Sequence, residues 1–137
     1  DLLIHRFSAS DAQAHEVTQA GSPGFDFATS TFLDRNGDLW ITGQVGARNG
    51  SLITFNGKTT KGALDLMAWR FTVPSGTGKA TPTSEYYMLG TDQDESYGYG
   101  AMDSAGRLWL AGSTSGQFPG GPANGGGLDA FVAQVAK

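Results

Sequence analysis

The side chains that could bind a metal fall into two short acidic groups, and the first lies in the segment 34–38. Asp34, Asn36 and Asp38 place oxygen ligands at alternate positions, as calcium loops do. The segment lacks the glycine that an EF-hand loop carries at its sixth position, and its counterpart, 103–107, keeps one of the three ligands. Asn36-Gly37 is also a strong signal for a hairpin turn, so a plain hairpin is the competing interpretation.

The second acidic group is denser and contains Asp92, Asp94 and Glu95. Calcium is again the metal that carboxylate oxygens would suit, and a solvated acidic loop is the competing interpretation. We therefore expect no cofactor, with calcium as the one ion to be weighed. His5 and His15 have no second ligand at metal-binding spacing, so we expect ordinary strand or surface residues.

No set of residues predicts catalysis. The segment Ser113-Thr-Ser115 has no histidine at corresponding positions that could activate a nucleophile, and no pair of carboxylates recurs for acid–base work. Gly125-Gly-Gly127 does not precede a helix, so a phosphate cradle is not expected. The sequence therefore predicts a protein that is not an enzyme, and it identifies no binding residues.

Four tyrosines lie close together in the sequence and leave two interpretations open. An aromatic platform of this kind could bind a sugar, whereas alternating tyrosines in a strand more often pack against a half-buried surface. The residues are Tyr86, Tyr87, Tyr97 and Tyr99.

The composition restricts the class of protein. The chain of 137 residues is long enough for one domain with a core, its charged fraction is 16%, and 21 glycines without a Gly-X-Y period predict many tight turns. A net charge of −4 without a basic stripe argues against nucleic acid as a partner. No apolar run reaches the ~20 residues needed to cross a bilayer, so membrane insertion is not expected. The absence of cysteine excludes disulfides and thiolate metal sites.

The chain contains an internal repeat. The segments 1–7, 65–71 and 129–135 match one another, and each begins 64 residues after the start of the preceding one. The segments between them match at an offset of 69, because length changes are confined to connections, as expected of a repeated structural unit. We predict one domain, 1–137, with repeat one at 1–64, repeat two at 65–128, and the first strand of a third repeat at 129–137.

The repeat unit predicts four short antiparallel strands. In the first copy we expect strands at 1–7, 16–21, 25–33 and 39–42, the last ended by Gly43, followed by a loop-like segment at 44–62. No helical period persists, so the chain is all-β, and such units point to β-propeller-type blades, about two per chain. Small residues suit inner strands that crowd toward a central channel; these are Ala28, Ser30, Gly98, Gly100 and Ala101.

The second copy resembles a known family. Residues 103–119, DSAGRLWLAGSTSGQFP, and 125–135, GGGLDAFVAQV, are similar to the bacterial and archaeal β-propeller repeat abbreviated SBBP. That repeat reads D-x-x-G-x-x-Y-V-T-G-S-T-x-S-x-x-F-P and then G-G-x-D-A-F-V-A-K-L. The first copy departs from the pattern with Gln44-Val45 after Gly43. The resemblance implies a secreted or cell-surface protein, usually part of a large multidomain chain, and implies no shared catalytic residues.

Two blades leave two outer sheet faces and unpaired edges, which a soluble protein must cover. We therefore expect a structural or adhesive building block that associates with copies of itself, as a ring or a filament, through blade packing and strand exchange. A carbohydrate-binding lectin on the same scaffold, with glycans as partners, is the first alternative. A fragment of a larger cell-surface propeller protein is the second.

Overall fold

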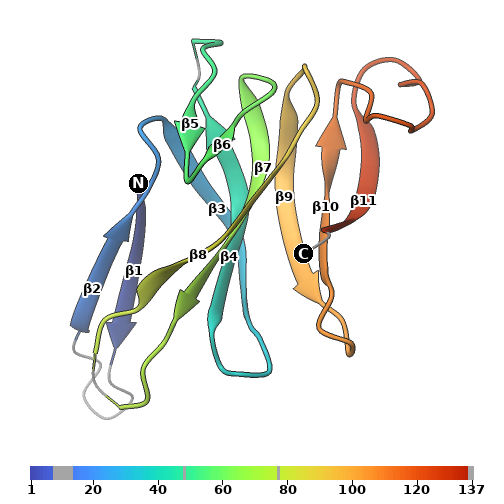
Figure 1. Ribbon diagram of the computed structural model, residues 1–137. Coiled ribbons are helices and arrows are strands. Elements are labelled where there is room, and N and C mark those ends of the chain that lie inside the picture. Colours follow the sequence, from blue (N-terminus) through green and yellow to red (C-terminus); the bar gives the residue numbers. More distant parts are fainter. Residues whose placement is uncertain (8–13, 48, 77, 136–137) are drawn as a thin grey trace.

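A computed structural model describes residues 1–7, 14–47, 49–76 and 78–135, which form eleven β-strands and no helix (Figure 1). The predicted all-β class is therefore confirmed. No helix in this part of the chain could cross a membrane. The strands are β1 (Leu2–Phe7), β2 (Ala14–Ala20), β3 (Phe25–Leu33), β4 (Leu39–Gly46), β5 (Thr54–Phe55), β6 (Lys58–Thr59), β7 (Leu64–Thr72), β8 (Thr81–Leu89), β9 (Glu95–Met102), β10 (Leu108–Thr114) and β11 (Asp129–Val135).

The strands form three main antiparallel sheets that lie side by side along the molecule (Figure 1). The N-terminal sheet pairs β1 with β2, the central sheet has the order β3-β4-β7-β8, and the C-terminal sheet has the order β9-β10-β11. The small hairpin β5–β6 stands beside them. Within the described ranges no closed barrel or closed propeller is formed.

The central sheet is buried on both faces, and each face forms one half of a hydrophobic core. One cluster joins it to β1 and contains Leu2, Ile41 and Trp69. The other joins it to the C-terminal sheet and contains Trp40 and Leu110. Because side chains alternate across a strand, neighbouring residues such as Trp40 and Ile41 enter opposite clusters. Strands buried on both faces explain the apolar runs of β4 and β7.

The hairpins β3–β4 and β9–β10, called the inner hairpins below because β3 and β9 lie at neighbouring sheet edges, repeat one turn geometry. In the first, the Gly37 N–H donates to the Asp34 carbonyl, and the Asp34 N–H donates to the Asp38 carbonyl. Gly37 has a φ of 82°, so the turn is a three-residue connection with the glycine in the left-handed region, not a two-residue turn on Asn36-Gly37. The second hairpin repeats these bonds around Asp103, with Gly106 at a φ of 77°.

Both inner hairpins also carry a β-bulge, which brings the central and C-terminal sheets together. The register of β3 and β4 shifts between Ala28 and Ser30, opposite Gly43. The bulged Thr29 donates its hydroxyl to the Gly98 carbonyl of β9 at 2.6 Å, and the Gly100 N–H donates to the Ser30 hydroxyl at 3.2 Å. A bulge re-aims one side chain, and here it links neighbouring sheets.

Two sequence-based expectations were wrong. β4 does not end at Gly43 but continues to Gly46, and β10 likewise continues to Thr114. Gly43 lies inside β4, where a Cβ would collide with the Phe27 carbonyl, so the glycine is needed for close pairing and is not a strand terminator. The segment expected to be loop-like, 44–62, contains the β5–β6 hairpin, which turns on Asn56-Gly57.

Candidate functional site

The first candidate calcium segment folds into a turn that its own acidic side chain stabilises. One oxygen of Asp34 accepts hydrogen bonds from the backbone N–H groups of Asn36 and Asp38, at 2.8 and 3.1 Å, and the other accepts from Trp40 Nε1 at 3.3 Å. Burial alone would raise the pKa of Asp34, but these hydrogen bonds and the charge of Arg70 hold that pKa below its usual range. The carboxylate therefore has a structural role in closing the hairpin.

The counterpart turn is built in the same way. Asp103 accepts from the N–H groups of Ala105 and Arg107 and, at 2.9 Å, from Trp109 Nε1. The Trp109 hydrogen bond, followed by the backbone and guanidinium bonds of Arg107, depresses the pKa of Asp103. An aspartate that caps the turn and fixes the tryptophan is thus a shared element of both inner hairpins.

The third strand of the central sheet supplies a cation to the first of these turns. Arg70 of β7 lies with its Nε 3.3 Å from Asp34 and its Nη1 3.1 Å from Glu85. The third guanidinium nitrogen, Nη2, contacts Asp38 at 2.5 Å. Burial would lower the pKa of Arg70, but the bonds to Asp38 and Glu85 raise it. Asp34 and Asp38, two of the predicted calcium ligands, are therefore ion-paired to this arginine.

The second candidate calcium segment is divided between solvent and core. Glu95 is fully buried, and its oxygens accept from the Thr91 N–H, the Thr91 hydroxyl and, at 2.7 Å, the Thr114 hydroxyl. Asp94 accepts at 3.2 Å from the Leu64 N–H, and Asp92 is exposed. Glu95 thus fastens the loop before β9 to the strand β10.

The structure therefore separates the six predicted ligands: Asp34 and Glu95 accept hydrogen bonds from turn and loop residues, Asp38 pairs with Arg70, and Asp92 is exposed. In the described residues, no group of three or more carboxylate, histidine or cysteine side chains is placed to hold a metal ion. Asn36 lies exposed in its turn. Calcium binding stays a prediction for these positions, which are Asp34, Asn36, Asp38, Asp92, Asp94 and Glu95.

The histidines and tyrosines do not form one site. His5 is an exposed residue of β1 and stacks on Phe7 with ring centroids 6.1 Å apart, whereas the side chain of His15 lies outside the described residues. Tyr86 is buried in the core, and its hydroxyl finds no hydrogen-bond partner within the described part of the chain. Burial raises the pKa of the Tyr86 phenol. Tyr97 and Tyr99 of β9 are exposed.

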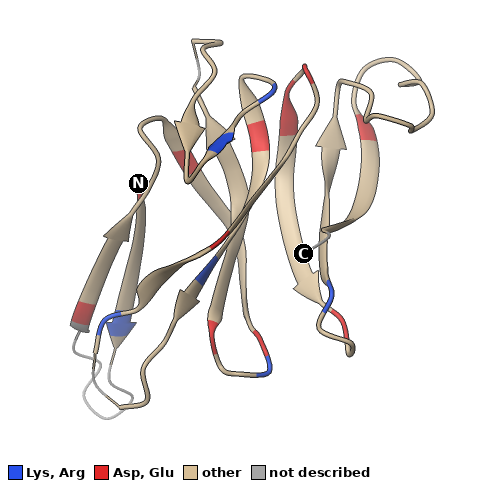
Figure 2. Cartoon of the chain, in the orientation of Figure 1, with Lys and Arg blue, Asp and Glu red and all other residues tan. Residues whose placement is uncertain are grey.

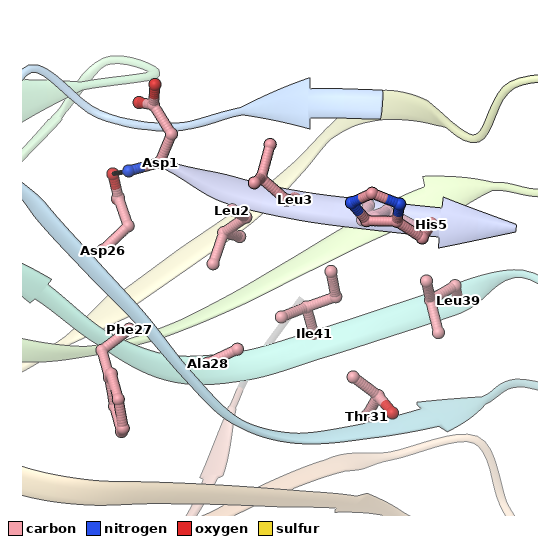
Figure 3. Close-up of a pocket in the computed structure, with 11 residues that line it drawn as sticks. Asp1, Leu2, Leu3, His5, Asp26, Phe27, Ala28, Thr31, Leu39 and Ile41 are labelled. Carbon is pink, nitrogen blue, oxygen red and sulfur yellow. Dashed lines mark ion pairs between the residues drawn. The ribbon is translucent and has the colours of Figure 1, made fainter. Parts of the chain in front are cut away.

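A groove of about 490 Å³ lies beside the first strand. This β1 groove lies between β1 and the strands β3 and β4, and Figure 3 shows Leu2, Ile41 and Thr31 along it. On β1 only the edge facing β2 is paired in the described structure, so the edge facing the groove presents free backbone N–H and C=O groups.

The outward face of the N-terminal sheet is apolar and exposed. This N-face carries Leu3, Phe7 and Val17, which are 61%, 60% and 42% exposed. Leu3 and Phe7 lie on one face of β1 by alternation, and Val17 pairs with His5 on the same face. The opposite face of β1, with Leu2, packs on the central sheet.

The C-terminal sheet has a matching outward face. This C-face carries Tyr99 and Val132, which are 53% and 69% exposed, together with Ala111, and these three residues are cross-strand neighbours. The charged side chains lie mainly at turns and strand ends, and they leave the strands of this sheet largely uncharged (Figure 2). Two apolar sheet faces therefore point away from the central sheet, one at each side of the molecule.

The sequence did not predict which residues line the β1 groove or which residues lie on the two exposed faces. Leu3 and Val132 are ordinary strand residues in the sequence, and alternation does not say which of two faces is covered. Neither a family model, nor a curated protein, nor a solved structure matches the chain. The resemblance to the propeller repeat stays a prediction.

Proposed function

We propose that the chain is a non-enzymatic structural or adhesive building block whose sheets are β-propeller-type blades and which associates with copies of itself. The observation that carries the proposal is the pair of outward apolar faces. At an offset of 64, the N-face residues Leu3 and Phe7 correspond to Met67 and Phe71, which are fully buried on the central sheet. The C-face residue Val132 corresponds in the same way to the fully buried Ala68.

The proposed contact joins the C-face of one copy to the N-face of the next. The central sheet already makes this kind of contact twice, because its two faces pack on β1 and on the C-terminal sheet. A contact between two different faces is heterologous, so it generates a ring if the rotation closes and a filament if it does not. Covering exposed Leu, Phe and Val side chains supplies the favourable free energy.

The resemblance to the propeller repeat supports a secreted or cell-surface location for such a building block. The absence of cysteine is compatible with any compartment, so the location depends on the resemblance alone.

Two single substitutions test the contact. Leu3→Lys places a charge on the N-face and Val132→Lys places one on the C-face, and each variant alone should sediment as a monomer because one of its two faces is blocked. A mixture should form a one-to-one complex, because the Leu3→Lys copy keeps its C-face and the Val132→Lys copy keeps its N-face. Leu33→Lys, at another exposed leucine outside both faces, is the matched control and should associate as the native protein does.

Sedimentation velocity separates the outcomes. If the mixture contains only monomers, the heterologous contact is wrong. If either single variant associates as the native protein does, the face that carries its substitution is not part of the interface.

Glycan binding is a second candidate function, and one observation favours it. Tyr97 and Tyr99 are exposed, and Tyr97 has a φ of 62°, an uncommon conformation for a tyrosine that recurs where a side chain is held for function. A glycan array should then give a signal that Tyr97→Ala and Tyr99→Ala both remove. A native protein without signal would end this candidate and leave self-association unaffected.

A further inference from the structure

The β1 groove lies along an edge of β1 that another strand could pair with. In the central sheet, β4 pairs with β7 along its whole length, from Leu39 opposite Phe71 to Gly46 opposite Leu64. In the N-terminal sheet, the corresponding edge of β1 pairs with nothing in the described chain, and the groove lies along it (Figure 3). A strand of the β4 type would satisfy this edge.

The chain contains a second strand of that type in β10. It pairs with β11 from Leu108 opposite Val135 to Thr114 opposite Asp129, and the β4–β7 register contains the same pairs at offsets of 69 and 64. β1 shares the pattern of β7 and β11, since all three segments begin at an aspartate and have matching apolar positions. Strand β10 of a second copy therefore fits the edge of β1 in a defined register.

The charged side chains of the N-terminal and C-terminal sheets are complementary, which favours β1 as a partner for β10. In the central sheet, Arg70 of the third strand joins Asp34 of the inner turn to Glu85 of the fourth strand. The N-terminal sheet holds the arginine and glutamate of this set as the cross-strand pair Arg6 and Glu16.

The C-terminal sheet holds the remaining member of the set. Asp103 stands in its inner turn, but β11 offers Gln134 at the arginine position. With Arg107 beside Asp103, the four side chains brought together from two copies would carry no net charge: Arg6, Glu16, Asp103 and Arg107.

We propose that β10 of one copy pairs with β1 of a second copy, with Leu108 opposite Phe7 and Thr114 opposite Asp1, and that β1 takes the place of β11. This inference rests on the proposed self-association, but it makes the contact by strand pairing instead of by packing the C-face on the N-face. Leu3 and Phe7 of the second copy would then pack on the central sheet of the first copy. Val132 would leave with β11, so Val132→Lys would not block this contact. The completed sheet has the order β9-β10-β1-β2, the four-stranded order of the central sheet.

The exchange conserves backbone pairing and buries side chains of β1 that are exposed in one copy. One ladder with β10 is lost and one is gained, so the number of strand pairings is unchanged. Leu3 and Phe7 would enter the positions of Phe131 and Val135, which pack against the second core cluster. The strand that leaves, β11, has Ala130, Val132 and Gln134 exposed, so it is only half-buried where it stands.

Engineered cysteines test the register, because the chain has no natural cysteine. The proposed register places Ala111 of β10 directly opposite Ile4 of the second copy. In one copy these residues lie on opposite sides of the central sheet, so Ile4→Cys with Ala111→Cys can form a disulfide only between copies (Figure 1). We expect the double variant to give covalent dimers and larger products on mild oxidation, and to do so faster than either single variant, because only the double variant brings two cysteines within disulfide distance at the paired position.

A second double variant distinguishes an alternative contact. Ile4→Cys with Val132→Cys would cross-link if the edge of β11, still seated on β10, met β1 directly. Preferential cross-linking of this pair would overturn the exchange. Circular dichroism of each reduced variant establishes that the strands are intact before oxidation.

A charge substitution adds a readout that does not require a disulfide. Arg6→Glu should weaken association about tenfold, because it places two acids beside Asp103, whereas Lys58→Glu on the exposed strand β6 should leave the dissociation constant unchanged. Equal effects of the two substitutions would contradict the selected pairing.

The outcomes separate this inference from the proposed function. If the native protein associates but Ile4→Cys with Ala111→Cys does not cross-link, the strand exchange is wrong and self-association stands. If the native protein stays monomeric, both are wrong.

Discussion

At the scale of single residues, several acidic side chains stabilise turns and loops by accepting hydrogen bonds from backbone N–H groups. Asp34 and Asp103 cap the inner hairpins, and Glu95 fixes the loop before β9. Asp65 has the same role before β7, where its oxygens accept from the N–H groups of Lys61 and Gly62. The spacing that resembled a metal loop is explained by the need of tight turns for a nearby acceptor.

The turn-capping role of Asp103 predicts a pH dependence. Its pKa is lower in the folded chain than the ordinary carboxylate value of about 3.9, so its contribution to stability is present above that value and is lost as the pH falls toward the folded pKa. Asp103→Asn removes the charge and should flatten this acid limb. The urea-unfolding midpoints of the two proteins should differ at neutral pH, and the difference should shrink progressively as the pH falls below about 4. A difference that grows with acid would contradict the role.

Tyr86 gives a second prediction at this scale. Its hydroxyl is buried without a hydrogen-bond partner in the described structure, and an unsatisfied buried hydroxyl costs free energy. Tyr86→Phe should therefore raise the free energy of unfolding by about 1 kcal/mol. Tyr99→Phe, at an exposed position, is the control and should be neutral. A loss of stability in Tyr86→Phe would mean that the hydroxyl has a partner.

At the scale of elements, the sequence predicted strands better than it predicted their ends. Alternation in 25–33 and the turn signal after it located the first inner hairpin, because exposed and buried positions differ in residue type there. Gly43 was misread as a terminator, since a glycine that permits close strand pairing looks the same in sequence as one that ends a strand. The Asn56-Gly57 turn was overlooked because its flanking strands, β5 and β6, have two residues each.

The candidate site was less predictable than the strands. Ligand spacing is a local property, whereas the partner of Asp34 and Asp38 is Arg70, more than thirty residues away on another strand. Similarly, whether Leu3 is exposed depends on which sheets stack, and no single-strand pattern encodes it. Only the repeat gave long-range information, because it predicts that β1 and β7 are equivalent strands.

The glycine inside β4 provides the test at this scale. Gly43→Ala would drive its Cβ into the Phe27 carbonyl at the bulge, so we expect a loss of about 3 kcal/mol in the free energy of unfolding. Gly125→Ala is the matched control, because its Cβ would contact only the Asp129 carboxylate at ordinary distance, 3.6 Å. Chemical denaturation of both variants measures the difference. Equal stabilities would show that β3 and β4 do not pair as closely as described.

At the scale of the whole molecule, the arrangement is one complete sheet between two partial ones. Among the residues that the structure describes, the central sheet has four strands and both faces covered, whereas its neighbours have two and three strands and one covered face each. An apolar sheet face and an unpaired edge both favour association with another chain. The proposed self-association follows from this difference between the covered central sheet and the two partly exposed outer sheets.

The molar mass of the native protein in solution tests this account most directly. Light scattering over a series of concentrations should give a mass that rises above the 14.3 kDa of one chain and reaches a multiple of it, with a fixed multiple for a ring and continued growth for a filament. A mass that stays at one chain up to millimolar concentration would contradict self-association through the N-face and the C-face.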